Sequence, residues 1–506
     1  MKILLVYPQI PDTFWSFKHA LKFISKKSSY PPLGLLTVAA MLPDYWEKRL
    51  IDMNVTTLKD DDLKWADYVF ISAMTVQRES VESVIKRCKH IGVSTVAGGP
   101  LFTAEYDEFA NVDYLVLDEV ETTISQFVDD LQKGCATHIY RSQERPELSA
   151  TPIPAWELIN LKNYGGINIQ YSRGCPFDCE FCDIVVLNGH KPRTKSTQQF
   201  INELEAIYRL GWDQNIFIVD DNFIGNKKKL KGELLPALIE WMNTRQHPFS
   251  FLTEVSINIA DDDELMDLMI KAGFDTLFIG IESPSEDCLT ECGKFQNKNR
   301  DLLLSVKKLQ NHGFQVQGGF IVGFDSDIAS IFDNMINFIQ HSGIVTAMVG
   351  LLNAPTGTRL YHRLKQENRL TRKFQGNNTD ISMNFMPKME YETLITGYRR
   401  IINTIYSPKE YYDRIYTFLR EYQPAFKKKV SLNRGQVNAF IKSLWILGIK
   451  RKERIHYWKL LLWTLFRRPR FFVLSVTLAI CGFHFRQVAE NIVNLSTNRN
   501  AYKTLQ

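Results

Sequence analysis

The chain has 506 residues, of which 45% are hydrophobic and 12% aromatic, and a formal net charge of +5. This composition predicts about two to four folded domains with ordinary apolar cores and argues against a disordered chain. The charge is small for this length and creates no uniform positive field, so we expect no nucleic-acid partner.

The first ten residues, MKILLVYPQI, carry one lysine and a short apolar run that ends before Pro8. A secretory signal needs a longer apolar region and a cleavage site of small residues. We therefore interpret this run as a strand and expect a cytoplasmic protein. Its eight cysteines should stay reduced and form no disulfide framework.

Residues 1–140 alternate short β-rich apolar runs with helical patterns. Between the third and fourth runs, Val81, Val84, Ile85 and Cys88 recur at the spacing of one helix face. This βαβ series predicts a doubly wound, Rossmann-like domain with a parallel sheet.

A second alternating series of six apolar runs covers residues 166–385, after a proline-containing linker at residues 141–165. Six βα units predict a partial (β/α)6 barrel, similar to a TIM barrel but short of its eight strands. Ligands of such sheets bind outside the carboxyl ends of the strands. Residues 386–506 are helical in pattern, aromatic and basic, and predict a helical C-terminal domain behind the two α/β domains.

Three cysteines, Cys175, Cys179 and Cys182, lie within eight positions after the first strand of the second series. The Cys-x3-Cys-x2-Cys spacing brings three thiolates close enough to hold one metal centre. A 4Fe–4S cluster needs four ligands, so three thiolates leave one iron open. A structural zinc ion also needs four ligands, and His190 or Asp183 would complete that site. The spacing alone leaves the cluster, zinc and three unrelated thiols as alternatives.

This spacing resembles the signature of the radical S-adenosylmethionine (SAM) enzymes. In that family SAM chelates the open iron, and an electron from the reduced cluster cleaves SAM to a 5′-deoxyadenosyl radical. The resemblance implies that the three cysteines are the metal ligands and catalytic residues, and that Phe181 shields the cluster. It also implies a one-electron reductant, such as a flavodoxin or a ferredoxin.

Polar residues at later strand ends resemble SAM contacts of the family. The sequence VDDNF ends the second strand of the series, where the family contacts the methionine amino group, and TEVSI ends the third, where ribose or carboxylate contacts are common. The resemblance assigns these contacts to Asp220 and Asp221 and to Glu254 and Ser256.

The strand GGFIVGF resembles the glycine-containing strand that supports the adenine of SAM. Glycine allows a ligand to approach the backbone closely. The residues assigned to this contact are Gly319 and Gly323. Each of these matches is weak alone, and their order after the cysteine loop strengthens them together.

The first domain resembles the cobalamin-binding module of one large subclass. There a Ser-x-Leu element and a later Gly-Gly line the slot for the nucleotide tail, and Ser72, Gly98 and Gly99 occupy similar strand ends. The Asp-x-His-x-x-Gly element that supplies an axial imidazole is absent, because Asp12 and His19 have the wrong spacing. We therefore expect methylcobalamin without a protein ligand on its lower face; the alternative is a regulatory domain without a corrinoid.

The C-terminal region is strongly basic, with fourteen Lys or Arg residues against one acid between Lys427 and Arg486. Fifteen largely apolar residues lie between Arg470 and Arg486; as a helix they would span about 22 Å, short of the roughly 30 Å hydrocarbon core. We expect no membrane crossing. Together with the basic, tryptophan-containing segment before it, this stretch predicts either a surface that lies on anionic lipid or a helical cap on the barrel.

At closer range, about residues 1–425 resemble the cobalamin-dependent (class B type) radical SAM enzymes that include the bacterial hopanoid 2-methylases. The resemblance implies methylation of an unactivated carbon in a polycyclic lipid. Such a carbon has no acidic proton, so general base catalysis yields no nucleophile there and a radical is needed. The alternatives are a cyclase, an oxidase or a methylase for another hydrophobic metabolite, and a non-catalytic iron–sulfur or zinc scaffold.

Overall fold

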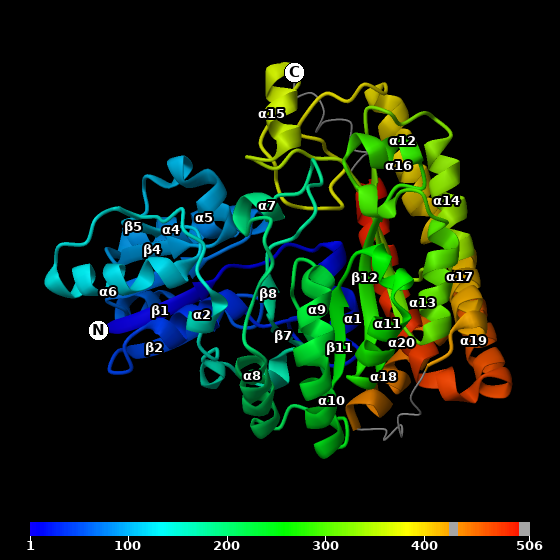
Figure 1. The fold of residues 1–506 in the computed structure, drawn as a ribbon, viewed down its shortest axis with the longest axis horizontal. Coiled ribbons are helices and arrows are strands. Elements are labelled where there is room, and N and C mark those ends of the chain that lie inside the picture. Colours follow the sequence, from blue (N-terminus) through cyan, green and yellow to red (C-terminus); the bar gives the residue numbers. More distant parts are fainter. Residues whose placement is uncertain (425–433, 495–506) are drawn as a thin grey trace.

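The computed structural model describes residues 1–424 and 434–494. It confirms the expected architecture of two parallel α/β sheets followed by a helical region (Figure 1). Each apolar run that was predicted as a strand forms one, and a short additional strand, β6, joins the first sheet. The exact domain boundaries at residues 140, 165 and 385 stay predictions.

The first sheet is parallel, with the strand order β2-β1-β3-β4-β5-β6. Its direction of winding reverses between β1 and β3, and such a switch opens a crevice at the carboxyl ends of these two strands. The strands are β1 (Lys2–Tyr7), β2 (Glu47–Asp52), β3 (Tyr68–Ser72), β4 (Ser94–Gly98), β5 (Tyr114–Val116) and β6 (Ile139–Tyr140).

Helices cover both faces of the first sheet because successive strand residues alternate between two apolar cores. In β1, Leu4 and Val6 pack in one core with the helices α3, α4 and α5, while Ile3 and Leu5 pack in the other with α2 and α6. These helices are α2 (Leu33–Met41), α3 (Asp60–Trp65), α4 (Arg78–Ile91), α5 (Pro100–Glu105) and α6 (Ile124–Lys133).

The second sheet is also parallel and has the order β14-β13-β12-β11-β10-β7, so β7 and β14 are its two edges and the barrel is open. Its strands are β7 (Ile167–Ile169), β10 (Asn215–Ile218), β11 (Ser250–Glu254), β12 (Phe274–Glu282), β13 (Gln315–Val322) and β14 (Ala347–Leu351). The helices between them are α8 (Thr197–Arg209), α9 (Lys227–Lys229), α10 (Leu235–Thr244), α11 (Asp263–Lys271), α12 (Glu286–Glu291), α13 (Leu302–His312) and α14 (Ile331–Ser342).

The C-terminal helices lie mostly beside α13 and α14, and the first of them lies apart at the top of the view (Figure 1). They are α15 (Arg359–Gln366), α16 (Tyr391–Ile405), α17 (Pro408–Glu421), α18 (Arg434–Trp445), α19 (Arg454–Arg467) and α20 (Phe472–Asn494), and the π-helical turn η12 (Ile446–Lys450) follows α18. Residues 469–492 are long and apolar enough to cross a bilayer by length and composition, but 61% of an apolar 18-residue segment within them is buried inside the protein. Of the two alternatives expected for this stretch, a surface on lipid and a helical cap on the barrel, its burial favours the cap.

Candidate active site

The three cysteines lie in a loop that a short antiparallel ladder closes. The strands β8 (Ser172–Arg173) and β9 (Arg193–Thr194) pair with each other on either side of the loop, which also contains α7 (Ile184–Leu187). At the start of the loop, Gly174 has φ 99°, and a Cβ there would lie 2.8 Å from the carbonyl oxygen of Lys191. Only glycine fits this turn without strain.

The three cysteine sulfurs are not grouped closely enough to surround a single metal ion. Four ligands at about 2.3 Å from a zinc ion would place the sulfurs roughly 4 Å apart. Among the described residues, the three Sγ atoms are not all within 4.8 Å of one another. Burial raises the pKa of all three thiols, so the thiolates require a bound cationic centre. This donor set fits an iron–sulfur cluster better than zinc.

The two aspartates at the end of β10 bind the cysteine loop itself. The carboxylate of Asp220 accepts hydrogen bonds from the backbone N–H groups of Tyr171 and Ser172 at 2.7 and 2.8 Å. Asp221 accepts from the N–H of Gly174 at 2.8 Å and from Asn188 at 2.9 Å. Burial raises the pKa of Asp220 to about 7. Both residues lie beside the cysteine loop and are hydrogen-bonded to it, and their assignment as SAM contacts stays a prediction.

Glu254, at the end of β11, lies near Asp221 and Lys294, and its side chain makes no hydrogen bond within the part of the chain that the structure describes. Burial raises its pKa to about 8, the charge of Asp221 adds to this, and Lys294 opposes it. Ser256 is turned aside, because its hydroxyl donates to Asn258 at 2.7 Å. The sequence interpretation thus places one free carboxyl group in the site.

Two residues of the site were missed from the sequence. Lys294, after α12, places Nζ 2.7 Å from Oε1 of Glu282 at the end of β12, and its charge acts on Cys179 and Cys182. Glu282 has φ 63°, a left-handed conformation that is rare for a residue with a side chain. The signal in the sequence that could have indicated Glu282 was its position at the end of a predicted strand, in GIES.

An aromatic pair lies beside the third cysteine. The ring centroids of Phe181 and Phe324 are 6.3 Å apart, and Phe324 follows the turn at Gly323, which has φ 107°. On β13, a Cβ at Gly319 would lie 2.9 Å from the ring of Phe278. Gly319 therefore keeps space beside an aromatic ring, whereas a Cβ at Gly323 would lie 3.1 Å from Met383 and 3.4 Å from Leu394.

In the first domain, the structure brings together the three residues predicted for the corrinoid slot. Ser72 and Gly98 are paired in adjacent strands. Gly99 has φ 92°, and a Cβ there would lie 2.6 Å from Oγ of Ser72. This cradle is lined by backbone and one small hydroxyl at the strand ends, which fits the tail of a corrinoid.

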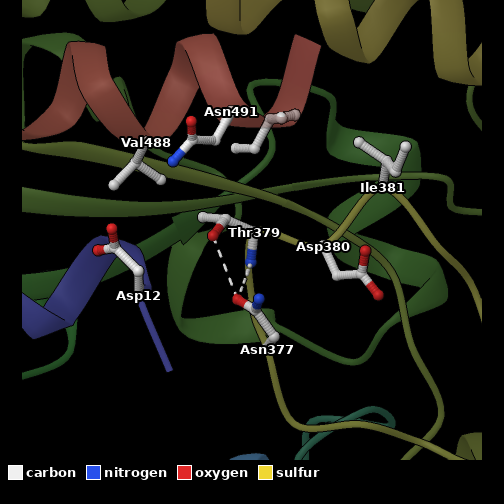
Figure 2. Close-up of a pocket in the computed structure, with 8 residues that line it drawn as sticks. Asp12, Asn377, Thr379, Asp380, Ile381, Val488 and Asn491 are labelled. Carbon is white, nitrogen blue, oxygen red and sulfur yellow. Dashed lines mark hydrogen bonds between the residues drawn. The ribbon is translucent and has the colours of Figure 1, made fainter. Parts of the chain in front are cut away.

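The β1 loop carries Asp12 and His19, which pair with each other. His19 lies in α1 (Lys18–Leu21), and its Nε2 is 2.7 Å from Oδ2 of Asp12. Asp12 also lines a small pocket between the β1 loop, residues 377–381 and α20 (Figure 2). Gly376, next to this segment, abuts Thr75 and Val76 after β3, because a Cβ would lie 2.8 Å from the N of Val76.

Buried ion pairs join the two α/β domains under the cysteine loop. Glu119, after β5, accepts hydrogen bonds from Arg173 at 2.9 Å and from Arg193 at 2.6 and 2.9 Å. Arg173 also pairs with Glu121 at 2.7 Å. Because Arg173 lies two residues before Cys175, the first domain directly contacts the support of the metal site.

The interior of the barrel is lined by apolar side chains that keep partial solvent access. Strand residues alternate between the two faces of a sheet; on each of these strands, fully buried residues pack under the helices, and their half-buried neighbours point the other way. The half-buried apolar set is Phe217, Leu252, Phe278, Ile321 and Met348. Trp15 of the first domain contacts Phe278 with ring centroids 5.4 Å apart.

Three family models match the chain. Residues 23–128 match the B12 binding domain, residues 169–339 match the Radical SAM superfamily, and residues 358–498 match a domain of unknown function, DUF4070. The first two matches agree with the corrinoid cradle and with the cysteine loop.

Two curated relatives are similar over nearly the whole chain. An uncharacterized methyltransferase, sll1242, of Synechocystis sp. is 42% identical, covering 97% of this chain and 92% of the relative. The hopanoid C-2 methylase of Rhodopseudomonas palustris is 32% identical, covering 92% of this chain and 90% of the relative.

Solved structures show the same fold. The radical SAM methyltransferase TsrM from Kitasatospora setae, with cobalamin and a [4Fe-4S] cluster bound, matches with a TM-score of 0.60 and 14% identity, over 96% of this chain and 99% of that chain. The cobalamin-dependent radical enzyme OxsB, with aqua-cobalamin bound, matches with a TM-score of 0.60 over 99% of this chain and 81% of that chain.

Proposed function

Because this chain belongs to the cobalamin-dependent radical SAM methyltransferases, we propose that it methylates an unactivated carbon of a polycyclic lipid, and that this lipid is a hopanoid. The observation that carries the proposal is the 32% identity to a hopanoid C-2 methylase over about nine tenths of both chains. The apolar interior of the barrel supports it, because a polycyclic hydrocarbon would be held there by burial of its surface.

The enzyme uses a 4Fe–4S cluster, SAM and cobalamin. When bound, these groups supply two things: a radical that abstracts hydrogen, and a methyl group that is transferred. In our proposal the three cysteines of the loop hold the cluster. The cradle of Ser72, Gly98 and Gly99 holds the nucleotide tail of cobalamin, which fits the close approach that these residues allow.

For SAM, we assign the charged groups that face the cysteine loop. The ammonium group of Lys294 is placed to attract the carboxylate of SAM, and Glu282 holds that ammonium group in position. Glu254 is free to accept hydrogen bonds from the ribose hydroxyls. Asp220 and Asp221 act as positioning residues, because their oxygens are bound to the loop.

Apolar side chains are proposed to exclude water from the reacting carbon. Phe181 and Phe324 would shield the cluster side, Gly319 and Gly323 would leave room for the adenine, and Phe278 would contact the hydrocarbon. A site without water protects a carbon radical from side reactions.

The expected partners are a lipid substrate and a one-electron reductant such as a flavodoxin or ferredoxin. We place the protein in the cytoplasm, in peripheral contact with the inner face of the membrane, where a hopanoid would be dissolved. The methyltransferase relatives favour methyl transfer over the cyclase and oxidase alternatives and over a scaffold without catalysis.

The test is an assay without oxygen on reconstituted protein with SAM, a reductant, cobalamin and a hopanoid. We expect 5′-deoxyadenosine, S-adenosylhomocysteine and a methylated hopanoid in equal amounts. Lipid profiles of cells with and without the gene should differ in the same product. Formation of 5′-deoxyadenosine without methylated hopanoid, together with unchanged lipid profiles, would refute the hopanoid assignment while leaving methyl transfer in place.

A further inference from the structure

Exposed apolar side chains are concentrated on one part of the protein, the hairpin of α18, η12 and α19. Nine of the 22 exposed large apolar side chains among the described residues lie between residues 437 and 466. We call them the hairpin surface: Val437, Ile441, Trp445, Ile449, Ile455, Trp458, Leu462, Leu465 and Phe466. A cluster of this kind marks an interaction site on a soluble protein.

The spacing of these residues forms one continuous surface. Along α18 and η12 they recur every four residues, and along α19 they recur after three or four up to the adjacent pair Leu465 and Phe466. The two stripes meet where Ile449, Ile455, Trp458 and Leu462 line one shallow pocket. Trp458 fixes this junction, because its Nε1 donates to the carbonyl oxygen of Gly448 at 2.9 Å.

Helix α19 is apolar on two faces, and the protein covers one of them. Its residues Tyr457, Leu460, Leu461 and Thr464 are buried against the neighbouring helices, which include α17 and α20. The second face, from Ile455 to Phe466, has no cover among the described residues. A helix that is apolar all around needs a second partner for its open face.

Basic side chains surround the hairpin surface, and the described part of the hairpin has no exposed acid. Arg454 and Lys459 line the same pocket as Ile455 and Trp458, and other exposed bases lie close in sequence. Within the described residues, none of these bases forms an ion pair: Lys450, Lys452, Arg454, Lys459 and Arg467. The single acid, Glu453, is buried and pairs with Arg486.

The long apolar helix α20 is not part of the hairpin surface, although the sequence analysis included it in the possible lipid-binding stretch. The carbonyl oxygen of Leu478 accepts from the hydroxyl of Tyr411 at 2.8 Å, and a Cβ at Gly482 would lie 2.1 Å from the same ring. His484 is completely buried against the β1 loop. α20 therefore connects the first domain to the helices beside the barrel, and the hairpin lies outside it at the edge of the molecule (Figure 1).

We propose that the hairpin surface binds the face of an anionic lipid bilayer, with α18 and α19 lying in the plane of the interface. Apolar side chains would enter the boundary between headgroups and acyl chains, tryptophans would lie at headgroup level, and the bases would meet lipid phosphates. This inference deepens the proposed function. It rests on that function because a lipid substrate is the reason for the enzyme to bind a membrane. The binding itself does not depend on which lipid is methylated.

The charge of the hairpin surface favours a bilayer over a second copy of the chain as its partner. A symmetric dimer through this surface would bring the same unpaired bases face to face, with no exposed acid in the described hairpin to neutralise them. An anionic bilayer supplies the missing negative charge over a wide area.

Flotation of the full-length, cluster-loaded protein with vesicles tests the proposal. We expect binding to phosphatidylcholine vesicles that contain phosphatidylglycerol, little binding to phosphatidylcholine alone, and release at high salt. Hydrogen exchange of the wild-type protein should slow between residues 437 and 466 when anionic vesicles are added. Neither measurement needs substrate or turnover, so failure here is distinguishable from failure of the proposed function.

Two sets of substitutions separate the apolar from the electrostatic contribution. Ile455→Ser, Leu462→Ser and Phe466→Ser together should weaken binding about tenfold or more, because each removes exposed apolar area that the bilayer would cover. Lys452→Gln, Arg454→Gln and Lys459→Gln together should weaken it about a hundredfold. The iron content should be unchanged in both variants.

The matched control places serine at two exposed apolar positions outside the hairpin, Leu304 and Ile328. Leu304→Ser with Ile328→Ser should bind vesicles as the wild-type protein does. Wild-type protein that stays unbound to anionic vesicles would overturn the proposal, as would protection outside residues 437–466. A dimer in solution that the three serine substitutions dissociate would assign the surface to self-association instead.

Discussion

The ammonium nitrogen of Lys294 lies 2.7 Å from Oε1 of Glu282, on the side of the barrel where the cysteine loop closes. The Lys294 side chain is 13% exposed and that of Glu282 is 9% exposed, so the pair is shielded from bulk water. A Cβ at Gly280 would lie 2.8 Å from this nitrogen. The glycine at position 280 thus leaves room for the pair, whose ammonium group we propose as the contact for the carboxylate of SAM.

Lys294→Met should weaken SAM binding about 10- to 100-fold, because a charge-assisted hydrogen bond of this kind contributes roughly 1.5–3 kcal/mol. Anaerobic equilibrium dialysis with cluster-loaded protein measures this affinity. Lys298→Met is the matched control, since Lys298 bonds to Thr290 away from the cysteines, and it should bind SAM normally. Unchanged SAM affinity in Lys294→Met with full iron content would contradict the assignment.

Cys179→Ala should remove the cluster and stop formation of 5′-deoxyadenosine, because only two of the three cluster ligands would remain. Iron analysis and the visible spectrum of anaerobically purified protein check this. Cys292→Ala provides a control in the same place: Cys292 is buried, and its carbonyl oxygen accepts from the N–H of Glu180 in the loop. That variant keeps the backbone contact, so it should keep about four irons; iron retained by Cys179→Ala would refute the ligand assignment.

Gly99→Phe should abolish cobalamin binding and leave the iron content unchanged, because its side chain would enter the cradle at Ser72. Backbone strain alone predicts a smaller loss of cobalamin. A substitution at Gly92 distinguishes backbone strain from a blocked cradle. Gly92 has φ 81°, close to the 92° of Gly99, but nothing lies within 4 Å of its Cβ position. Gly92→Phe should therefore cost some stability and retain cobalt. Equal cobalt contents in the two variants would count against the corrinoid cradle.

The residues that were predictable from the sequence are those at the ends of strands. Ser72, Gly98, Gly99 and the cysteines follow apolar runs whose direction and order fix the edge at which they meet. Parallel sheets collect such residues on one side whatever their distance in sequence. The fold and the edge at which these residues meet could therefore be predicted together, while the assignment of Ser72, Gly98 and Gly99 to cobalamin stays a prediction.

Other features depended on contacts that the sequence pattern does not encode. Lys294 lies in a connecting segment without periodicity, and only the tertiary fold brings it to Glu282. Asp220 was predicted as a SAM contact, whereas its oxygens bind the backbone of the cysteine loop. The apolar stretch of α20 was ambiguous because burial inside a protein and contact with lipid favour the same residues.

Glu119→Gln should destabilise the contact between the two α/β domains by about 3 kcal/mol, because it leaves the buried guanidinium of Arg193 without its carboxylate. The thermal midpoint should fall, and methyl transfer per 5′-deoxyadenosine should decrease as the two cofactor sites lose their alignment. Glu47→Gln is the control: Glu47 pairs with Arg49, and both side chains are more than half exposed, so little change is expected. A normal ratio of products in Glu119→Gln would show that this pair does not align the sites.

The stability of the protein should fall in mild acid through His484. Burial lowers the pKa of this histidine to about 4; nearby His19 lowers it further, while the carbonyl oxygen of Phe14 and the charge of Asp12 oppose the shift. Its ordinary value is 6.5, so below that pH the unfolded chain binds a proton that the folded protein does not. The contribution of neutral His484 to the free energy of unfolding is fully present above about pH 6.5 and is lost as the pH falls towards 4.

His484→Gln keeps a donor for Phe14 without titrating. The free energy of unfolding of the wild-type protein should therefore fall by ~2 kcal/mol more than that of this variant between pH 7 and pH 5. Urea unfolding of both cluster-loaded proteins measures the difference, in which the acid sensitivity of the cluster cancels; parallel losses would show that His484 does not stay neutral in the folded protein.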